Sequence, residues 1–325
     1  MASALGCPVD TQGTVVPVDG FDAESDAQVL RKAMKGMGTN EKAIIKVVSK
    51  RSNKQLLEIM QKYKVLFGKD LIEDLKSELG GNFENLVVSL FVPCVDFKAN
   101  SLRRAMKGVG TDEEALIEII VPQSNEQMQE VVAKFKELFG RDLEKDIDSE
   151  LSGDFKRLLI SLCQGARDQV TEVDEAKAEK EAQDLYDAGE GQWGTDESRF
   201  NQVLALRSFP QLRATFEQYR KLAKRDIVSA IDKEMSGDLK QSMQAVVKVV
   251  ENTPLFYAER IYRSMKGAGT DDDTLIRIIV SRCEIDMVQI NDEFMKTYKK
   301  SIGTMIKSDC SGDYEKLLLA LVGED

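Results

Sequence analysis

The feature that most constrains this 325-residue chain is a glycine loop that returns four times, each time with a distant acid in fixed register. Three loops read Met-Lys-Gly-x-Gly-Thr and begin at Met34, Met106 and Met265, while a longer loop at 189–195 takes the third place. An acid follows 40 residues after the last glycine of every loop; these acids are Glu78, Glu150, Glu234 and Asp309. Simple packing would accept Gln at such a position, so the register indicates a chemical task.

The chemistry that fits this pattern is calcium binding. Glycine allows backbone conformations closed to other residues, so carbonyl oxygens can turn toward one point. Carbonyls, one carboxylate and water form the all-oxygen shell that Ca²⁺ prefers. A plain helix–loop–helix turn would explain one such loop, but it needs no acid at a constant distance. We therefore predict Ca²⁺ sites, with the loop threonines as N-caps of the helices that follow: Thr39, Thr111, Thr195 and Thr270.

The chain between the loops has helical periodicity. In the first unit, Leu56, Ile59, Met60 and Tyr63 follow the i, i+3, i+4, i+7 spacing of one helix face. Further helices are predicted at 22–35, after the loop near Ile44, and at 69–79 and 82–92. Strand-like alternation is scarce throughout. The sequence therefore predicts an all-α fold with about five helices in each repeat.

Composition excludes several classes of function. The chain has no His, which removes His-dependent nucleophile systems and His-ligated zinc or haem sites. Its net charge of −11 argues against nucleic-acid binding and against unaided binding to an anionic membrane. A cation between protein and lipid would overcome that repulsion. No segment approaches the ~20 apolar residues of a membrane span, and neither a signal-peptide pattern nor paired cysteine spacing is present, so we expect a cytoplasmic, peripheral protein.

On its four loops, the acids in register and the Ser-Gly-Asp that follows several of them, the chain resembles the annexin family from about Phe21 to its C-terminus. The resemblance implies an all-α fold of four repeats, each with about five helices, that together form one curved disc. It also implies Ca²⁺ as the cofactor and acidic phospholipid membranes, such as phosphatidylserine, as the partner. Binding is expected to be reversible and to place the protein at membranes when Ca²⁺ rises.

The resemblance also implies a ligand set for each loop. In the regular loops it consists of three carbonyls and the distant carboxylate; in the third loop the choice of carbonyls depends on the register adopted. The expected ligands are Met34, Gly36, Gly38 and Glu78, then Met106, Gly108, Gly110 and Glu150, then Gly189, Gln192, Gly194 and Glu234, and finally Met265, Gly267, Gly269 and Asp309. A weaker extra site is expected at the Thr39 carbonyl and the Glu41 carboxylate.

Loop side chains are the candidates for lipid contact. Trp193, the only Trp, stands in the third loop between polar and glycine neighbours, and Trp favours the membrane–water interface. The alternative for Trp193 is a place in the core. The other loops carry an apolar residue between glycines and a lysine before them, which we expect at the headgroups: Met37, Val109 and Ala268, with Lys35, Lys107 and Lys266.

The predicted organisation is a tail at 1–20, repeats at 21–92 and 93–164, a linker at 165–180, and repeats at 181–250 and 251–325. Repeat two departs from the family pattern, since it has Lys98 where an acid is usual and Gln123 where an Arg is usual. Those positions belong to a charged network along the annexin central passage. The substitutions therefore count against ion-channel behaviour.

The sequence raises three classes of function. The leading one is Ca²⁺-dependent, reversible binding to acidic phospholipid in membrane organisation, aggregation or trafficking, with no nucleic-acid partner. The alternative is a helical repeat scaffold for protein partners in which Ca²⁺ is secondary. An enzyme is not expected, because no nucleophile–base pair is evident. Self-association on membranes and secretion without a signal peptide remain open.

Overall fold

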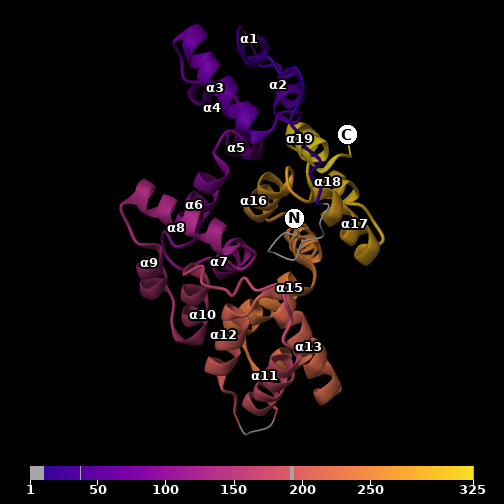
Figure 1. Cartoon of the computed structure of the whole chain (residues 1–325). Coiled ribbons are helices and arrows are strands. Elements are labelled where there is room, and N and C mark those ends of the chain that lie inside the picture. Colours follow the sequence, from indigo (N-terminus) through magenta and orange to yellow (C-terminus); the bar gives the residue numbers. More distant parts are fainter. Residues whose placement is uncertain (1–10, 37, 191–193, 325) are drawn as a thin grey trace. The chain divides into compact units, whose positions relative to one another are not determined.

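The computed structural model describes residues 11–36, 38–190 and 194–324. In these residues it contains nineteen helices and no strand, so the all-α prediction is confirmed (Figure 1). The chain divides into two compact units. One, the repeat-1/4 unit, joins Thr11–Phe97 to Tyr257–Asp325. The other, the repeat-2/3 unit, holds Lys98–Phe256.

The first repeat shows why the helices begin and end where they do. Asp22 and Asp70 accept backbone N–H bonds at the starts of α1 and α4, and Ser52 forms a capping box with Gln55 at α3. Gly68, with a left-handed φ of 64°, ends α3. The five helices are α1 (Ala23–Ala33), α2 (Glu41–Val48), α3 (Asn53–Phe67), α4 (Leu71–Glu78) and α5 (Gly81–Leu90).

The other repeats follow the same order of helices. Repeat two holds α6 (Cys94–Ala105), α7 (Glu113–Ile120), α8 (Asn125–Phe139), α9 (Leu143–Glu150) and α10 (Gly153–Cys163). Repeat three holds α11 (Glu175–Ala188), α12 (Glu197–Leu206), α13 (Phe209–Ala223), α14 (Ile227–Glu234) and the start of α15 (Gly237–Ser264). Repeat four continues from α15 to α16 (Asp272–Arg282), α17 (Met287–Tyr298), α18 (Ile302–Asp309) and α19 (Gly312–Val322).

Helix α15 serves two repeats because a kink divides it. Asn252 has non-helical angles of φ −158° and ψ 91°, and Pro254 follows two residues later. The Asn252 side chain accepts a hydrogen bond from Leu255 N at 3.0 Å, so it starts the second segment as a cap would. The last helix of repeat three therefore passes directly into the first helix of repeat four.

One buried aromatic ring stands at the same place in every repeat, 25 residues after the last loop glycine. All four rings are fully buried: Tyr63, Phe135, Tyr219 and Phe294. An aromatic ring buries more apolar area than most side chains and so fixes the third helix against its neighbours. The third helix of every repeat therefore has its buried ring at the same distance from the loop.

The described part of the tail packs within the repeat-1/4 unit. Val15 is buried, and its N–H donates to the Cys283 carbonyl at 3.0 Å. Gln55 exchanges two hydrogen bonds with the backbone of Val18, at 3.2 and 2.9 Å. A Cβ at Gly13 would lie 2.5 Å from the Glu284 backbone, so only glycine fits there. The tail therefore touches both repeats of this unit.

Candidate calcium and lipid site

Each loop is closed by one backbone hydrogen bond from the residue after its threonine to the end of the preceding helix. In the three regular loops the bond spans seven residues, and in the third loop it spans eight. The bonds run from Asn40 N to Ala33 O (2.9 Å), Asp112 N to Ala105 O (2.9 Å), Asp196 N to Ala188 O (2.7 Å) and Asp271 N to Ser264 O (2.7 Å). The loops are thus built alike, and the third accommodates one extra residue.

The loop glycines have backbone angles that other residues rarely adopt. The first glycine has φ of 117°, 119° and 126° at Gly36, Gly108 and Gly267. The second glycine has φ of 84°, 88°, 90° and 93° at Gly38, Gly110, Gly194 and Gly269. An L side chain would be strained at such angles, although space around each position is open. The repeated geometry explains why glycine stands at both positions.

The prediction that the loop threonines are N-caps is wrong by one residue. The side chain that accepts the first-turn N–H belongs to the next residue in each repeat: Asn40, Asp112, Asp196 and Asp271. Asn and Asp are among the preferred caps, so they take the position wherever the loop length allows. The threonine hydroxyls are left for other contacts.

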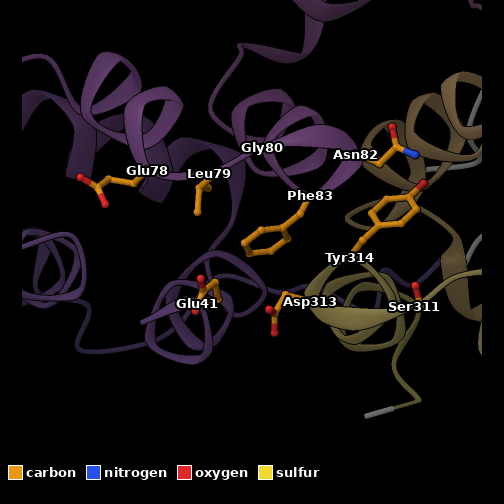
Figure 2. Close-up of a pocket in the computed structure, with 9 residues that line it drawn as sticks. All are labelled: Glu41, Glu78, Leu79, Gly80, Asn82, Phe83, Ser311, Asp313 and Tyr314. Carbon is orange, nitrogen blue, oxygen red and sulfur yellow. The ribbon is translucent and has the colours of Figure 1, made fainter. Parts of the chain in front are cut away.

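In the first repeat the threonine joins the loop to its distant acid. Thr39 Oγ1 donates to Glu78 Oε2 at 2.9 Å, although 39 residues separate them. Glu78 ends α4, and it lines a hollow of about 350 Å³ with Glu41 at the start of α2 and Asp313 at the start of α19 (Figure 2). The structure thus brings the two acids of the predicted first-loop sites to one hollow.

The donor set fits Ca²⁺ only when backbone oxygens are counted together with the carboxylate. The described residues contain no group of three His, Cys, Asp or Glu side chains arranged to hold one metal ion. Glu78 is exposed and hydrogen-bonded to the loop end, so it supplies one carboxylate beside backbone twisted by two glycines. One carboxylate with several carbonyls is the mixture that Ca²⁺ accepts in its flexible shell.

The third repeat has a different arrangement. Thr195 Oγ1 donates to the backbone carbonyl of Glu234 at 3.2 Å, while the Glu234 carboxylate lies 3.3 Å from Lys233 Nζ. Within the loop, Glu190 is 9% exposed; its Oε1 accepts from Tyr219 Oη at 3.2 Å and lies 3.5 Å from Arg225 Nε. The loop is therefore fastened to the buried ring of α13 by its own acid.

In the second and fourth repeats the acids Glu150 and Asp309 are exposed ends of α9 and α18. Thr270 hydrogen-bonds the side chain of Cys310, next to Asp309. Burial is the main cause that raises the pKa of the Cys310 thiol to about 11. The fourth loop end therefore also lies against the residue beside its acid.

The loop residues predicted to meet lipid point outward where the structure describes them. Val109 is fully exposed, and Ala268 and the loop lysines Lys35, Lys107 and Lys266 are exposed. In contrast, the side chains of the predicted carbonyl donors Met34, Met106 and Met265 are buried, so only their backbone can face a ligand. Met37, Gln192 and Trp193 lie outside the described residues.

A charged pair near the loops went unnoticed in the sequence. The residue 31 positions after the last loop glycine is basic in every repeat, and its acid partner varies. Lys69 Nζ lies 3.4 Å from Asp74, Arg141 Nη2 lies 2.7 Å from Asp146, and Arg225 Nε lies 3.5 Å from Glu190. In the fourth repeat the basic residue is Lys300 and the position of Asp74 holds Met305. Counting from the loop glycines would have found this register.

Repeat two keeps a contact at the unusual positions noted in its sequence. Lys98 Nζ donates to Gln123 Oε1 at 2.7 Å. The equivalent positions in repeat one form the ion pair between Arg51 and Asp26, at 2.6 Å. In repeat two the cation, Lys98, stands on the helix where repeat one has Asp26. The neutral amide of Gln123 stands in the turn where repeat one has Arg51.

The annexin family model matches four segments of the chain, at residues 25–90, 97–162, 180–246 and 256–321. The chain therefore belongs to the annexin family, as its resemblance predicted. Calcium-dependent binding to phospholipid is the general property of that family. No helix in the described residues is both long and apolar enough to cross a bilayer.

Individual relatives agree with this assignment. Human annexin A7 is 54% identical over 314 residues, which cover 97% of this chain and 64% of annexin A7, so the chain spans less than two thirds of that relative. Rat annexin A4 is 48% identical, with 96% and 98% of the two chains covered. Solved structures include annexin III, with a TM-score of 0.94, 45% identity and coverage of 98% and 100%. Calcium-bound annexin (Sm)1 has a TM-score of 0.86, 35% identity and coverage of 97% and 93%.

Proposed function

We propose that this chain binds acidic phospholipid membranes, such as those containing phosphatidylserine, reversibly and only when Ca²⁺ occupies its loops. The observation that carries the proposal is the first loop, where two glycines with positive φ and the Thr39–Glu78 hydrogen bond place a carboxylate beside turned backbone. A relative of 35% identity, annexin (Sm)1, has been solved in a calcium-bound state. The protein is then a peripheral one whose membrane residence follows the Ca²⁺ level.

The residues divide the task among themselves. The carbonyls of the twelve assigned loop residues and the acids Glu78, Glu150, Glu234 and Asp309 hold the ion, and Thr39 O with Glu41 holds a weaker one. Bound Ca²⁺ supplies positive charge and free coordination positions that lipid oxygens can fill. The exposed loop lysines and the apolar residue between the glycines meet the headgroup region. Trp193 is assigned the same interfacial role in the third loop.

Vesicle co-sedimentation over a series of Ca²⁺ concentrations tests the proposal. Vesicles with phosphatidylserine should bind the protein, vesicles of phosphatidylcholine alone should not, and a chelator should release it. Lipid oxygens fill coordination positions of the bound ion, so the two bind cooperatively. Each must therefore raise the affinity of the protein for the other by the same factor. Equal Ca²⁺ affinity with and without phosphatidylserine vesicles would contradict the proposal and favour the scaffold alternative.

A further inference from the structure

In each of the first three repeats an acid forms an ion pair with the basic residue at one fixed position. The fourth repeat has the basic residue at that position but lacks the ion pair. Lys69, Arg141 and Arg225 each have an acid within 3.5 Å. Lys300 occupies the same register, but Met305 replaces the acid, and among the described residues no carboxylate forms an ion pair with Lys300. This half-buried lysine therefore keeps its charge available beside the fourth loop.

A second free cation and an aromatic platform lie at the same place. Tyr262 stacks on Tyr298 with ring centroids 3.8 Å apart and planes 7° from parallel. Lys266 Nζ lies 5.6 Å and Lys300 Nζ 5.3 Å from the Tyr262 centroid. Tyr298 stacks on Tyr262, and both ammonium groups lie close to the same Tyr262 ring. The attraction of a cation to an aromatic ring favours this position for each lysine.

The pair is specific to repeat four. Lys35 and Lys107 stand in their loops where Lys266 stands, but the second cation of those repeats is held by Asp74 or Asp146. In repeat one Arg31 also pairs with Asp74, at 3.1 Å, whereas the position of Arg31 in repeat four holds Tyr262, which has no charge to attract an acid. Of the charged groups nearby, Glu259 and Arg263 act on Tyr298 with opposite signs. Lys266 and Lys300 therefore bring two positive charges to one ring on a chain of net charge −11.

We infer that Lys266 and Lys300 bind a phosphate monoester on the headgroup of an acidic lipid, beside the fourth calcium loop. A monoester carries about −1.5 to −2 charges near neutral pH, which two ammonium groups match. A diester phosphate or a serine carboxylate carries only one. Lysine is a common phosphate ligand because it acts as a compact point charge. The inference rests on the proposed membrane binding, to which it adds a preference among acidic lipids.

The test uses the full chain and vesicles of matched surface charge at saturating Ca²⁺. One set contains phosphatidic acid, whose phosphate is a monoester, and the other contains phosphatidylserine. Lys300→Gln should weaken binding to phosphatidic acid by roughly fivefold, as expected for one lysine at a charged surface. Binding to phosphatidylserine should change by less than about twofold, because its headgroup has no phosphate monoester to pair with both lysines. Lys266→Gln should act in the same direction, and the double variant more strongly.

Lys69→Gln is the matched control, because Lys69 has the same register but is paired with Asp74. It should leave the lipid preference unchanged, and circular dichroism should show that every variant keeps its helices. A wild-type protein with equal affinity for both lipids, or a Lys300→Gln variant that behaves like Lys69→Gln, would overturn the inference.

Calorimetric titration with inorganic phosphate and with glycerol 3-phosphate separates the sources of the phosphate group. Millimolar binding that Lys300→Gln abolishes would support the same site and extend it to soluble esters. Binding seen only on vesicles would support the site and assign it to lipid. Should wild type fail to bind phosphatidylserine vesicles with Ca²⁺, the proposed function would fail, while these titrations would still decide whether the lysine pair binds phosphate.

Discussion

The first and third loops lie at the same distance from their acids in the sequence, but their repeats attach them differently. In repeat one, the buried Tyr63 donates to Asp74 of α4 at 2.6 Å, and Lys69 lies 3.4 Å from the same acid. In repeat three, the equivalent Tyr219 and Arg225 instead contact Glu190, which belongs to the predicted calcium loop itself. Ala230 fills the place of Asp74.

The acid that contacts the buried tyrosine lies in α4 in repeat one and in the loop in repeat three. This difference in position changes which part of the repeat the loop is attached to. Asp74 joins α4 to Tyr63 of α3 and to Arg31 of α1, while the first loop itself has its Thr39–Glu78 contact. Glu190 instead ties the start of the third loop to α13, next to Gly189, a predicted ligand. The third acid, Glu234, is turned to Lys233. A repeat can thus keep its register and still acquire a loop whose geometry depends on a charge pair.

The largest expected effect comes from the acids. Glu78→Gln should raise the Ca²⁺ needed for binding to phosphatidylserine vesicles by roughly tenfold, because it removes the charged ligand from a site already joined to its loop. Glu234→Gln should raise it by only about threefold, because the wild-type carboxylate must first leave Lys233. Co-sedimentation over a Ca²⁺ series measures both. Circular dichroism is the control, since a loss of helix in Glu78→Gln would make that acid structural.

A smaller effect should distinguish the Tyr63–Asp74 contact of repeat one from the Tyr219–Glu190 contact of repeat three. Glu190→Gln should raise the Ca²⁺ concentration at which Trp193 emission shifts to the blue on acidic vesicles by roughly threefold, because a less ordered loop binds less well. Asp74→Asn should leave that midpoint unchanged, since it acts in repeat one. Met37→Trp in a Trp193→Phe background moves the fluorescent reporter to the first loop. The Ca²⁺ midpoint of its emission shift should change with neither Glu190→Gln nor Asp74→Asn.

The readout in that experiment is itself a prediction. Trp193 emission should shift to the blue with Ca²⁺ and acidic vesicles and return when a chelator is added. A spectrum already blue in Ca²⁺-free buffer, and unmoved by vesicles, would place Trp193 in the core and remove it from the lipid site.

The smallest expected effect is on pH dependence. Burial, and then the hydrogen bond to Asp74, raise the pKa of Tyr63 from 10.0 to about 12. The folded state therefore retains a proton that the unfolded chain loses, and this contribution to stability is complete below pH 10.0 and disappears as the pH rises to about 12. Asp74→Asn should lower the pKa of Tyr63, as measured by tyrosinate absorbance. It should also narrow the pH range over which this contribution to stability is lost, as measured by unfolding at alkaline pH.

Tyr219 supplies the comparison for this measurement. Its pKa is raised, first by burial and then by Glu190. Glu190→Gln should therefore lower the pKa of Tyr219 and leave Tyr63 unaltered. If either substitution changed the pKa values of both tyrosines equally, the Tyr63–Asp74 and Tyr219–Glu190 contacts would not be independent.

The sequence alone determined the all-α fold, the four repeats and the positions of loops and acids. Helical periodicity and glycine are local properties that reach at most a few turns along the chain, so they can be read without the fold. The register of 40 residues is also visible in the sequence. The threonine caps were misplaced because Asn40, Asp112, Asp196 and Asp271 compete for the same N–H groups, and only the loop closure shows which residue reaches them.

The tertiary structure decided which charges meet. Nothing in the local sequence of Glu190 indicates that Tyr219 and Arg225, 29 and 35 residues away, complete its contacts. The same holds for Lys266 and Lys300, which meet at Tyr262 only because α15 and α17 pack together through a tyrosine stack. Ion pairs depend on distances of a few ångströms between side chains remote in sequence. Those distances are set by how the helices pack, and periodicity along one helix does not contain them.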